Sequence, residues 1–243
     1  MCSSDLSACA FSAGTPGGTT AKWNELLRRL LRHPAAAGNP LQVFTYADVV
    51  AEFPEYQVSF WPVDAAFLQQ LWVNSAPGQQ IPPGTPKFQP LAGVRLEQII
   101  STACSDIPSP RNPAAYVKAA RAAAARSGPF GPLFAWGYEP CARWPREAAT
   151  DRYPGPWNRP TASTILLMGN TTDPATPYHD SVMMAHDLAH GRLLTVHGYG
   201  HTEITNPSSC AAGYVTSYLI TGALPPAGTV CQQNATPFGV TGS

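Results

Sequence analysis

The sequence predicts an α/β fold in which a mostly helical region precedes the last strands and helices of a doubly wound parallel sheet. Two short apolar runs, Thr164–Gly169 and Arg192–Val196, are typical of buried parallel strands, and a helical stretch separates them. Before them, residues 7–157 carry helical patterns on long proline-rich connections, with little strand signal. We therefore expect the sheet in the last third of the chain.

Three helices are predicted in the first region. Apolar residues recur at helical spacing over Trp23–Leu31, with basic residues on the other face, until Pro34 stops the helix. Asp64 is expected to cap a second helix. A third helix, opened by an Asn-Pro pair, is expected over residues 112–126 and ends at Gly128. Short helices on long connections suit a cap or lid better than a sheet.

The last region has the order strand, helix, strand, helix. Between the two apolar runs, a helix is expected from about Ser181 to His190, ended by Gly191. After the second run, Asn206–Pro207 is expected to cap a helix that stops at Gly222. The inward face of this last helix is expected to carry Tyr214, Val215, Tyr218 and Leu219.

Composition excludes several classes of function. Charged residues make up 12% of the chain and balance to a net charge of +0, which argues against nucleic acid or an anionic membrane surface as a partner. No apolar run reaches the roughly 18 residues of a membrane span. The 6 cysteines lack the spacing of a metal site, so disulfides in an exported protein are the better interpretation.

The N-terminus does not have the basic and then apolar layout of a signal peptide. Residues 1–6 match the translation of a common sequencing adapter, so we interpret them as an artefact and expect the natural sequence to begin at about Ser7. A signal peptide is then expected on sequence upstream, and the protein is expected to be secreted or held in the cell envelope.

A polar residue with catalytic chemistry follows each predicted strand, where open α/β sheets build their sites. Asp173 lies in the loop 169–177, and His201 lies 28 residues later in the loop 197–201. An imidazole can take the proton of a serine, while a carboxylate on its other nitrogen fixes the tautomer. The pair therefore indicates the acid and base of a serine triad, although each residue alone is also an ordinary loop residue.

The residues around this pair resemble a known family. The run Gly169–Pro177, then Gly198–His201, then Cys210 and the segment ending in Gly228–Cys231, is similar to the C-terminal region of the tripeptidyl-aminopeptidase-like (TAP-like) α/β-hydrolases. The likeness is close over residues 160–238 and looser upstream. It implies a secreted serine exopeptidase that releases short peptides from substrate N-termini, with Asp173 as acid and His201 as base.

The sequence departs from that family in one large respect, because it contains no Gly-x-Ser-x-Gly motif. The nucleophile and the earlier strands are therefore expected upstream, and this chain alone is expected to be inactive and poorly soluble. We expect three parts: residues 1–6 as an artefact, 7–157 as a helical cap, and 158–243 as the C-terminal part of the catalytic domain.

Disulfides are expected between Cys210 and Cys231, which flank the last helix, and between Cys104 and Cys141 in the cap. Connectivity cannot be deduced from sequence alone, so geometry could change either pair. Cys9 is expected to have its partner on missing sequence, with Cys2 part of the artefact.

Two other functions remain open: an esterase or lipase of the same fold, and a non-catalytic exported binding domain. The expected ligand is a peptide or small ester, with no cofactor or metal, and the oligomeric state is left open. The spacing of His186 and His190, with His179 nearby, is compatible with zinc, but a third ligand is not apparent and a solvated helix face explains these histidines. An exopeptidase also needs a carboxylate for the substrate amine, for which the candidates are Glu97, Glu139 and Glu203.

Overall fold

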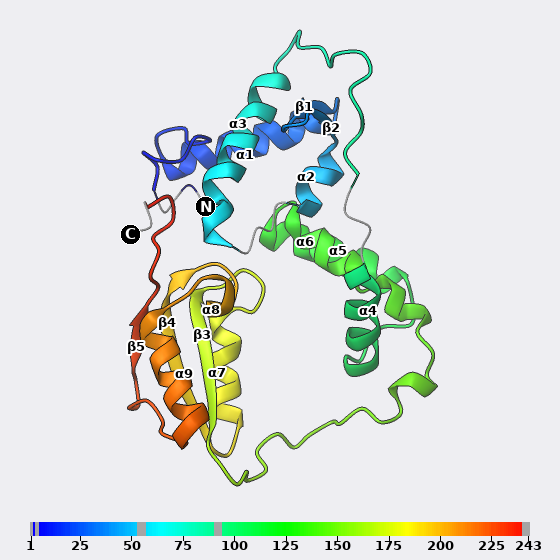
Figure 1. Ribbon diagram of the computed structural model, residues 1–243. Helices are drawn as coiled ribbons and strands as arrows, with labels where there is room; N and C mark the ends of the chain where they lie inside the picture. Colours follow the sequence, from blue (N-terminus) through cyan, green and yellow to red (C-terminus); the bar gives the residue numbers. More distant parts are fainter. Residues whose placement is uncertain (1, 3–4, 53–56, 90–93, 240–243) are drawn as a thin grey trace. The chain divides into compact units, whose positions relative to one another are not determined.

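A computed structural model describes residues 2, 5–52, 57–89 and 94–239 (Figure 1). The chain forms two compact units. One unit comprises residues 1–43, 54–85 and 156–243, and the other comprises residues 44–53 and 86–155. The expected division into 7–157 and 158–243 stays a prediction, and the compact units divide the chain elsewhere, because two stretches before residue 86 group with the sheet.

The first unit contains a parallel sheet with the strand order β3-β4-β5 (Figure 1). Its strands are β3 (Ile165–Thr172), β4 (Gly191–Tyr199) and β5 (Val230–Gln232). The α/β fold class is confirmed. Both predicted strands run further than expected, so the loops after them shrink to residues 173–177 and 200–201. Strand β5 was not predicted, because three residues are too few to show a pattern.

The core of the sheet lies around β4. Leu194 and Val196 are fully buried there, together with Ala211 and Cys231. The register pairs Ile165 with Gly191 and then shifts by one position beyond residue 170. This shift brings the ends of β3 and β4 level with each other.

Helices α7 (Tyr178–Asp187), α8 (Thr202–Thr205) and α9 (Ser209–Thr221) connect the strands. Helix α7 packs against β3 and β4, and it begins and ends three residues earlier than expected. Gly222 ends α9 in a left-handed conformation, as predicted.

Two expectations for α9 were wrong. Ser208 caps this helix, since its hydroxyl accepts a hydrogen bond from the Ala211 N–H at 3.2 Å, and Asn206 does not. Leu219 is 75% exposed, because the face toward the core carries Ala211 and Tyr214 and none of the described residues covers the opposite face.

The rest of the first unit is helical, with two short strands that were not expected. It contains α1 (Pro16–Leu30), β1 (Ala35–Ala37), β2 (Gln42–Phe44, at the boundary), the 3-10 turn η2 (Val58–Phe60) and α3 (Trp61–Asn74). The apolar face of α1 is buried as predicted, except that Leu31 beyond its end is 65% exposed. Asp64 lies in the first turn of α3, not at its cap, because the helix already begins at Trp61.

The second unit is built from short helices. These are α2 (Tyr46–Glu52), α4 (Val94–Asp106), α5 (Ala114–Ser127), α6 (Phe130–Gly137), η3 (Glu139–Arg143) and η4 (Glu147–Ala149). Helix α5 matches the third predicted helix: the side chain of Asn112 accepts a hydrogen bond from the Ala114 N–H at 3.0 Å, and Gly128 ends the helix. Helices α4 and α6 were missed, because α4 follows no clear capping residue and α6 is rich in glycine and proline.

Both expected disulfides are present. The Cα atoms of Cys210 and Cys231 lie 5.6 Å apart, and those of Cys104 and Cys141 lie 5.0 Å apart. The structure also joins Cys2 to Cys9, whose Cα atoms lie 5.3 Å apart and so within bonding range. The expectation that Cys9 has no partner in this chain was therefore wrong. Among the described helices, none is both long enough and apolar enough to cross a membrane.

Candidate active site

Asp173 and His201 meet at the carboxyl ends of two neighbouring parallel strands. Strand β3 ends at Thr172, which pairs with Tyr199 near the end of β4. His201 Nδ1 lies 3.0 Å from each carboxylate oxygen of Asp173. The side chain of Asp173 is 3% exposed, whereas that of His201 is 31% exposed. The acid is therefore covered and the imidazole remains accessible, with Nδ1 turned to the acid as expected.

The Asp173 carboxylate accepts several hydrogen bonds besides that of the imidazole. The N–H groups of Ala175 and Thr176 donate to Oδ1, both at 2.8 Å. The Thr176 hydroxyl donates to Oδ2 at 2.9 Å, and the Thr202 N–H donates to the same oxygen at 3.2 Å. Burial acts to raise the pKa of Asp173, but the N–H groups of Thr176 and Ala175, the His201 ring and the Thr176 hydroxyl together hold it below its usual value. Asp173 is thus kept ionised.

The loop that carries His201 is held by two side-chain amides, of which Asn170 is buried and Gln233 is half-buried. Asn170, which is 3% exposed, donates through Nδ2 to the carbonyls of Tyr199 at 3.2 Å and Gly200 at 2.9 Å. Gln233 accepts from the Tyr199 N–H at 2.8 Å and donates back to its carbonyl at 3.1 Å. Gly200 has a φ of +85°, a conformation that favours glycine. These contacts fix where the chain turns into His201.

Asn206 holds the other side of the same loop. Its side chain accepts a hydrogen bond from the Val58 N–H at 2.9 Å and donates to the carbonyls of His201 at 3.0 Å and Thr202 at 3.2 Å. The residue is 2% exposed. Because the amide bridges these backbone groups, it is not available to cap α9.

A strained residue follows His201. Thr202 has a φ of 58°, which is unfavourable for a β-branched side chain. This conformation directs its N–H to Asp173, as described above. The local strain is therefore linked to the geometry of the acid.

Glu203 is a third ionisable group in this site. It is half-buried, and its Oε1 has no hydrogen-bond partner among the described residues. Burial raises the pKa of Glu203, and the charge of Asp173 raises it further, while its own backbone N–H and His201 act in the opposite direction. Of the three glutamates considered for the substrate amine, Glu203 lies beside Asp173 and His201, whereas Glu97 and Glu139 belong to the other unit.

The histidines considered for zinc lie elsewhere. The side chains of His179 and His186 are 78% and 84% exposed, and each faces the aspartate that follows it. His190 contacts the Thr161 carbonyl at 3.4 Å. Within the part of the chain that the structure describes, no three His, Cys, Asp or Glu residues form a group that could hold a metal ion.

The sequence reasoning missed the residues that position the pair, namely Asn170, Thr176, Asn206 and Gln233. A threonine three residues after an aspartate is a known turn signal, in which the two side chains and the backbone bond locally. That signal could have identified Thr176. The other three act across segments far apart in sequence, which local patterns do not reveal.

Comparison with known proteins gives consistent results. Residues 123–231 match the family described as TAP-like protein. Carboxylesterase B of Mycobacterium tuberculosis is 33% identical over 135 residues, which are 53% of this chain and 25% of that protein. Serine protease Hip1 of the same organism is 40% identical over 91 residues, covering 37% and 17% of the two chains. The tripeptidyl aminopeptidase of Streptomyces coelicolor is 32% identical over 109 residues, covering 42% and 19%.

The aligned residues thus span a quarter or less of these relatives' own length. The matched range includes Asp173, His201 and the Cys210–Cys231 disulfide. It also reaches upstream into the second unit, beyond the close resemblance seen in the sequence. Residues 123–231 of this chain are thus similar to the TAP-like α/β-hydrolases, and the parallel sheet is consistent with the C-terminal part of that fold.

Proposed function

We propose that this chain supplies the acid, Asp173, and the base, His201, of a secreted serine hydrolase that releases short peptides from the N-termini of its substrates. The observation that carries the proposal is the Asp173–His201 pair, with Nδ1 at 3.0 Å from both carboxylate oxygens. A buried and ionised carboxylate behind an accessible imidazole is the arrangement that a triad requires. The Cys104–Cys141 and Cys210–Cys231 disulfides support an oxidising compartment.

In this mechanism, Asp173 holds the tautomer in which Nε2 can accept a proton. His201 takes the proton of a serine hydroxyl as the serine attacks the scissile carbonyl, and it then gives that proton to the leaving amine. A water molecule follows the same route to release the acyl group. Asp173 stabilises the imidazolium at each stage, because its lowered pKa keeps it charged at neutral and mildly acidic pH.

The nucleophile has to come from polypeptide outside this sequence, which contains no Gly-x-Ser-x-Gly motif. We therefore expect the 243-residue chain alone to hydrolyse neither peptides nor esters. We expect it to be poorly soluble as well, because the described residues leave one edge of β3 unpaired.

Ester hydrolysis is the second candidate, and the similarity to a carboxylesterase favours it. Acid and base are the same in both reactions, so the pair does not separate them. The peptidase is preferred because two relatives are a serine protease and a tripeptidyl aminopeptidase, and because Glu203 offers a carboxylate for a substrate amine. A non-catalytic binding domain would not require the Asp173–His201 geometry.

The test uses this chain extended N-terminally by its nucleophile-bearing segment. The extended protein is assayed with tripeptide anilides that have a free amine, with the same anilides acetylated at that amine, and with short acyl esters. We expect hydrolysis of the free-amine anilides, and we expect His201→Ala to lower kcat by about 10³-fold or more. His186→Ala is the matched control, since this exposed histidine on α7 should leave kcat unchanged.

Equal turnover of free and acetylated anilides, or a clear preference for esters, would favour the esterase. Activity that survives His201→Ala with the protein folded would show that the base is misassigned. A folded, extended protein that hydrolyses none of these substrates would favour the binding domain.

A further inference from the structure

The second unit contains a cavity of about 490 Å³ beside the Cys104–Cys141 disulfide. It is lined by Cys104, Pro108, Ser109, Pro110, Arg111, Cys141, Trp144, Arg146 and Arg152. Three of these residues are arginines, and no carboxylate is among the described residues that line the cavity. The rest of the wall is largely apolar. The cavity thus combines concentrated positive charge with apolar surface.

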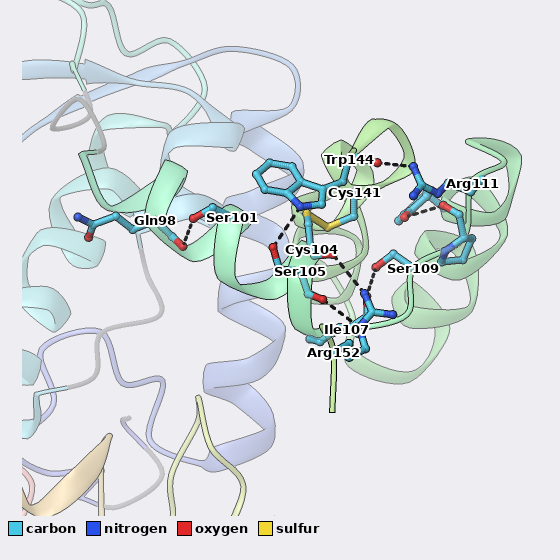
Figure 2. The surroundings of a disulfide bond; sticks show 12 residues. Gln98, Ser101, Cys104, Ser105, Ile107, Ser109, Arg111, Cys141, Trp144 and Arg152 are labelled. Carbon is cyan, nitrogen blue, oxygen red and sulfur yellow. Dashed lines mark hydrogen bonds between the residues drawn. A yellow bond between two sulfur atoms is a disulfide. The ribbon is translucent and has the colours of Figure 1, made fainter. Parts of the chain in front are cut away.

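Arg152 is held rigidly at this cavity. Its Nε donates to the Ser105 carbonyl at 2.9 Å, and its Nη2 donates to the carbonyls of Ile107 at 3.2 Å and Cys104 at 3.4 Å (Figure 2). These carbonyls lie at the C-terminal end of α4, where backbone oxygens lack helical partners. Arg152 therefore has a structural role, and it is also fixed in position at the cavity wall.

Arg111 is fixed as well. Its Nη1 donates to the Trp144 carbonyl, and the indole N–H of Trp144 donates to the Ser105 hydroxyl at 3.2 Å (Figure 2). Each guanidinium has five N–H donors, so these bonds leave others available on both arginines. The disulfide joins α4 to η3 and so ties the two sides of the cavity together.

Arg146 has no such structural explanation. It is exposed, and within the described part of the chain it makes no hydrogen bond or ion pair. A third guanidinium adds repulsion to a wall that already carries two. A bound anion would remove this repulsion.

We propose that this cavity binds a carboxylate carried on an apolar stem. A planar guanidinium accepts a carboxylate through two parallel hydrogen bonds, which favours this group over a neutral amide. Pro108, Pro110 and Trp144 provide the apolar wall for the stem. The inference does not depend on the proposed hydrolysis, although a peptide ending in an apolar residue would be one source of such a ligand.

Isothermal titration of the oxidised, N-terminally extended protein tests the site with defined probes: N-acetylphenylalanine, its amide, and inorganic phosphate. We expect the acid to bind at least about tenfold more tightly than the amide. Arg146→Gln should weaken binding of the acid by about three- to tenfold, and Arg146→Lys should restore part of it, because charge returns without the planar fork. Arg121→Gln is the matched control: it removes the same charge from an exposed position on α5 outside the cavity, and it should leave the affinity unchanged.

Equal affinity for acid and amide would overturn the inference, as would phosphate binding more tightly than the acid. An Arg121→Gln variant that weakens binding as much as Arg146→Gln would also overturn it. N-acetyl-Ala-Ala-Phe distinguishes the sources: tighter binding than N-acetylphenylalanine supports a peptide ligand, and weaker binding supports a small free acid in the same site. Binding is measured without turnover, so it can succeed where the hydrolase assay fails.

Discussion

The sheet and the second unit fix their polar groups in different ways. At the ends of β3 and β4, the strand ladder sets the backbone, and the buried amides of Asn170 and Asn206 then hold the His201 loop. Among the described residues of the second unit, no strand ladder links the helices, and the end of α4 is held by the Cys104–Cys141 disulfide and by Arg152. Backbone hydrogen bonds between strands therefore position the side chains at the sheet edge, whereas the position of the short helices depends on single disulfides and side-chain hydrogen bonds.

The largest effect is expected from removing disulfides in each region. Cys104→Ser with Cys141→Ser opens a loop of 37 residues, and Cys210→Ser with Cys231→Ser opens one of 21. Chain entropy alone gives losses of about 4 and about 3 kcal/mol in the free energy of unfolding. The loss of stability should be larger for the first pair than this small difference implies, because no strand ladder joins the described helices of the second unit.

Hydrogen exchange measured by peptide across the chain checks this expectation. The amides of α4 and α5 should lose protection in the first double variant, while those of β3 and β4 should keep theirs in the second. Equal loss of protection in both regions would show that the ladder gives the sheet no advantage.

The same contrast explains what the sequence could predict. Asp173 and His201 were predicted because parallel strands read as apolar runs and their ends meet at one edge of a sheet. Asn206 was misassigned as a helix cap, because its bond to the Val58 N–H spans 148 positions and leaves no local pattern. The arginines around Cys104 were missed for a similar reason: Arg152 bonds to carbonyls 45–48 residues away.

An intermediate effect is expected from removing the side chain that holds several backbone groups in each region. Asn206→Ala removes the buried side-chain acceptor of the Val58 N–H and one donor to each of the His201 and Thr202 carbonyls, and it should cost about 2–3 kcal/mol. Arg152→Gln removes three hydrogen bonds at a partly exposed site, where water can replace them, and it should cost about 1 kcal/mol. Chemical denaturation at pH 7 measures both. A larger loss for Arg152→Gln would reverse the ranking of the two regions.

The smallest effect concerns pH and the two carboxylates of the site. The lowered pKa of Asp173 contributes stability at pH values above its unfolded pKa, and this is lost as pH falls through the folded value. Glu203 has a raised pKa, so its contribution has the opposite sign: stability is retained below the unfolded pKa and declines as pH rises toward the folded value. Glu203→Gln should therefore raise Tm at pH 7 by about 1–3 °C and leave it unchanged at pH 4.

The control for this last comparison is Glu147→Gln, which changes an exposed glutamate in the second unit and should leave Tm equal to that of the unsubstituted protein at each of the two pH values. Half-burial keeps the change in Tm of Glu203→Gln small. Because salt screens a half-buried charge less than an exposed one, high salt should reduce this change in Tm less than it would for a surface ion pair. A gain at pH 4 equal to that at pH 7 would mean that the amide improves packing. In that case the stability of this site would not depend on the charge of Glu203. Burial beside Asp173 would then no longer explain why Glu203→Gln changes Tm while Glu147→Gln in the second unit does not.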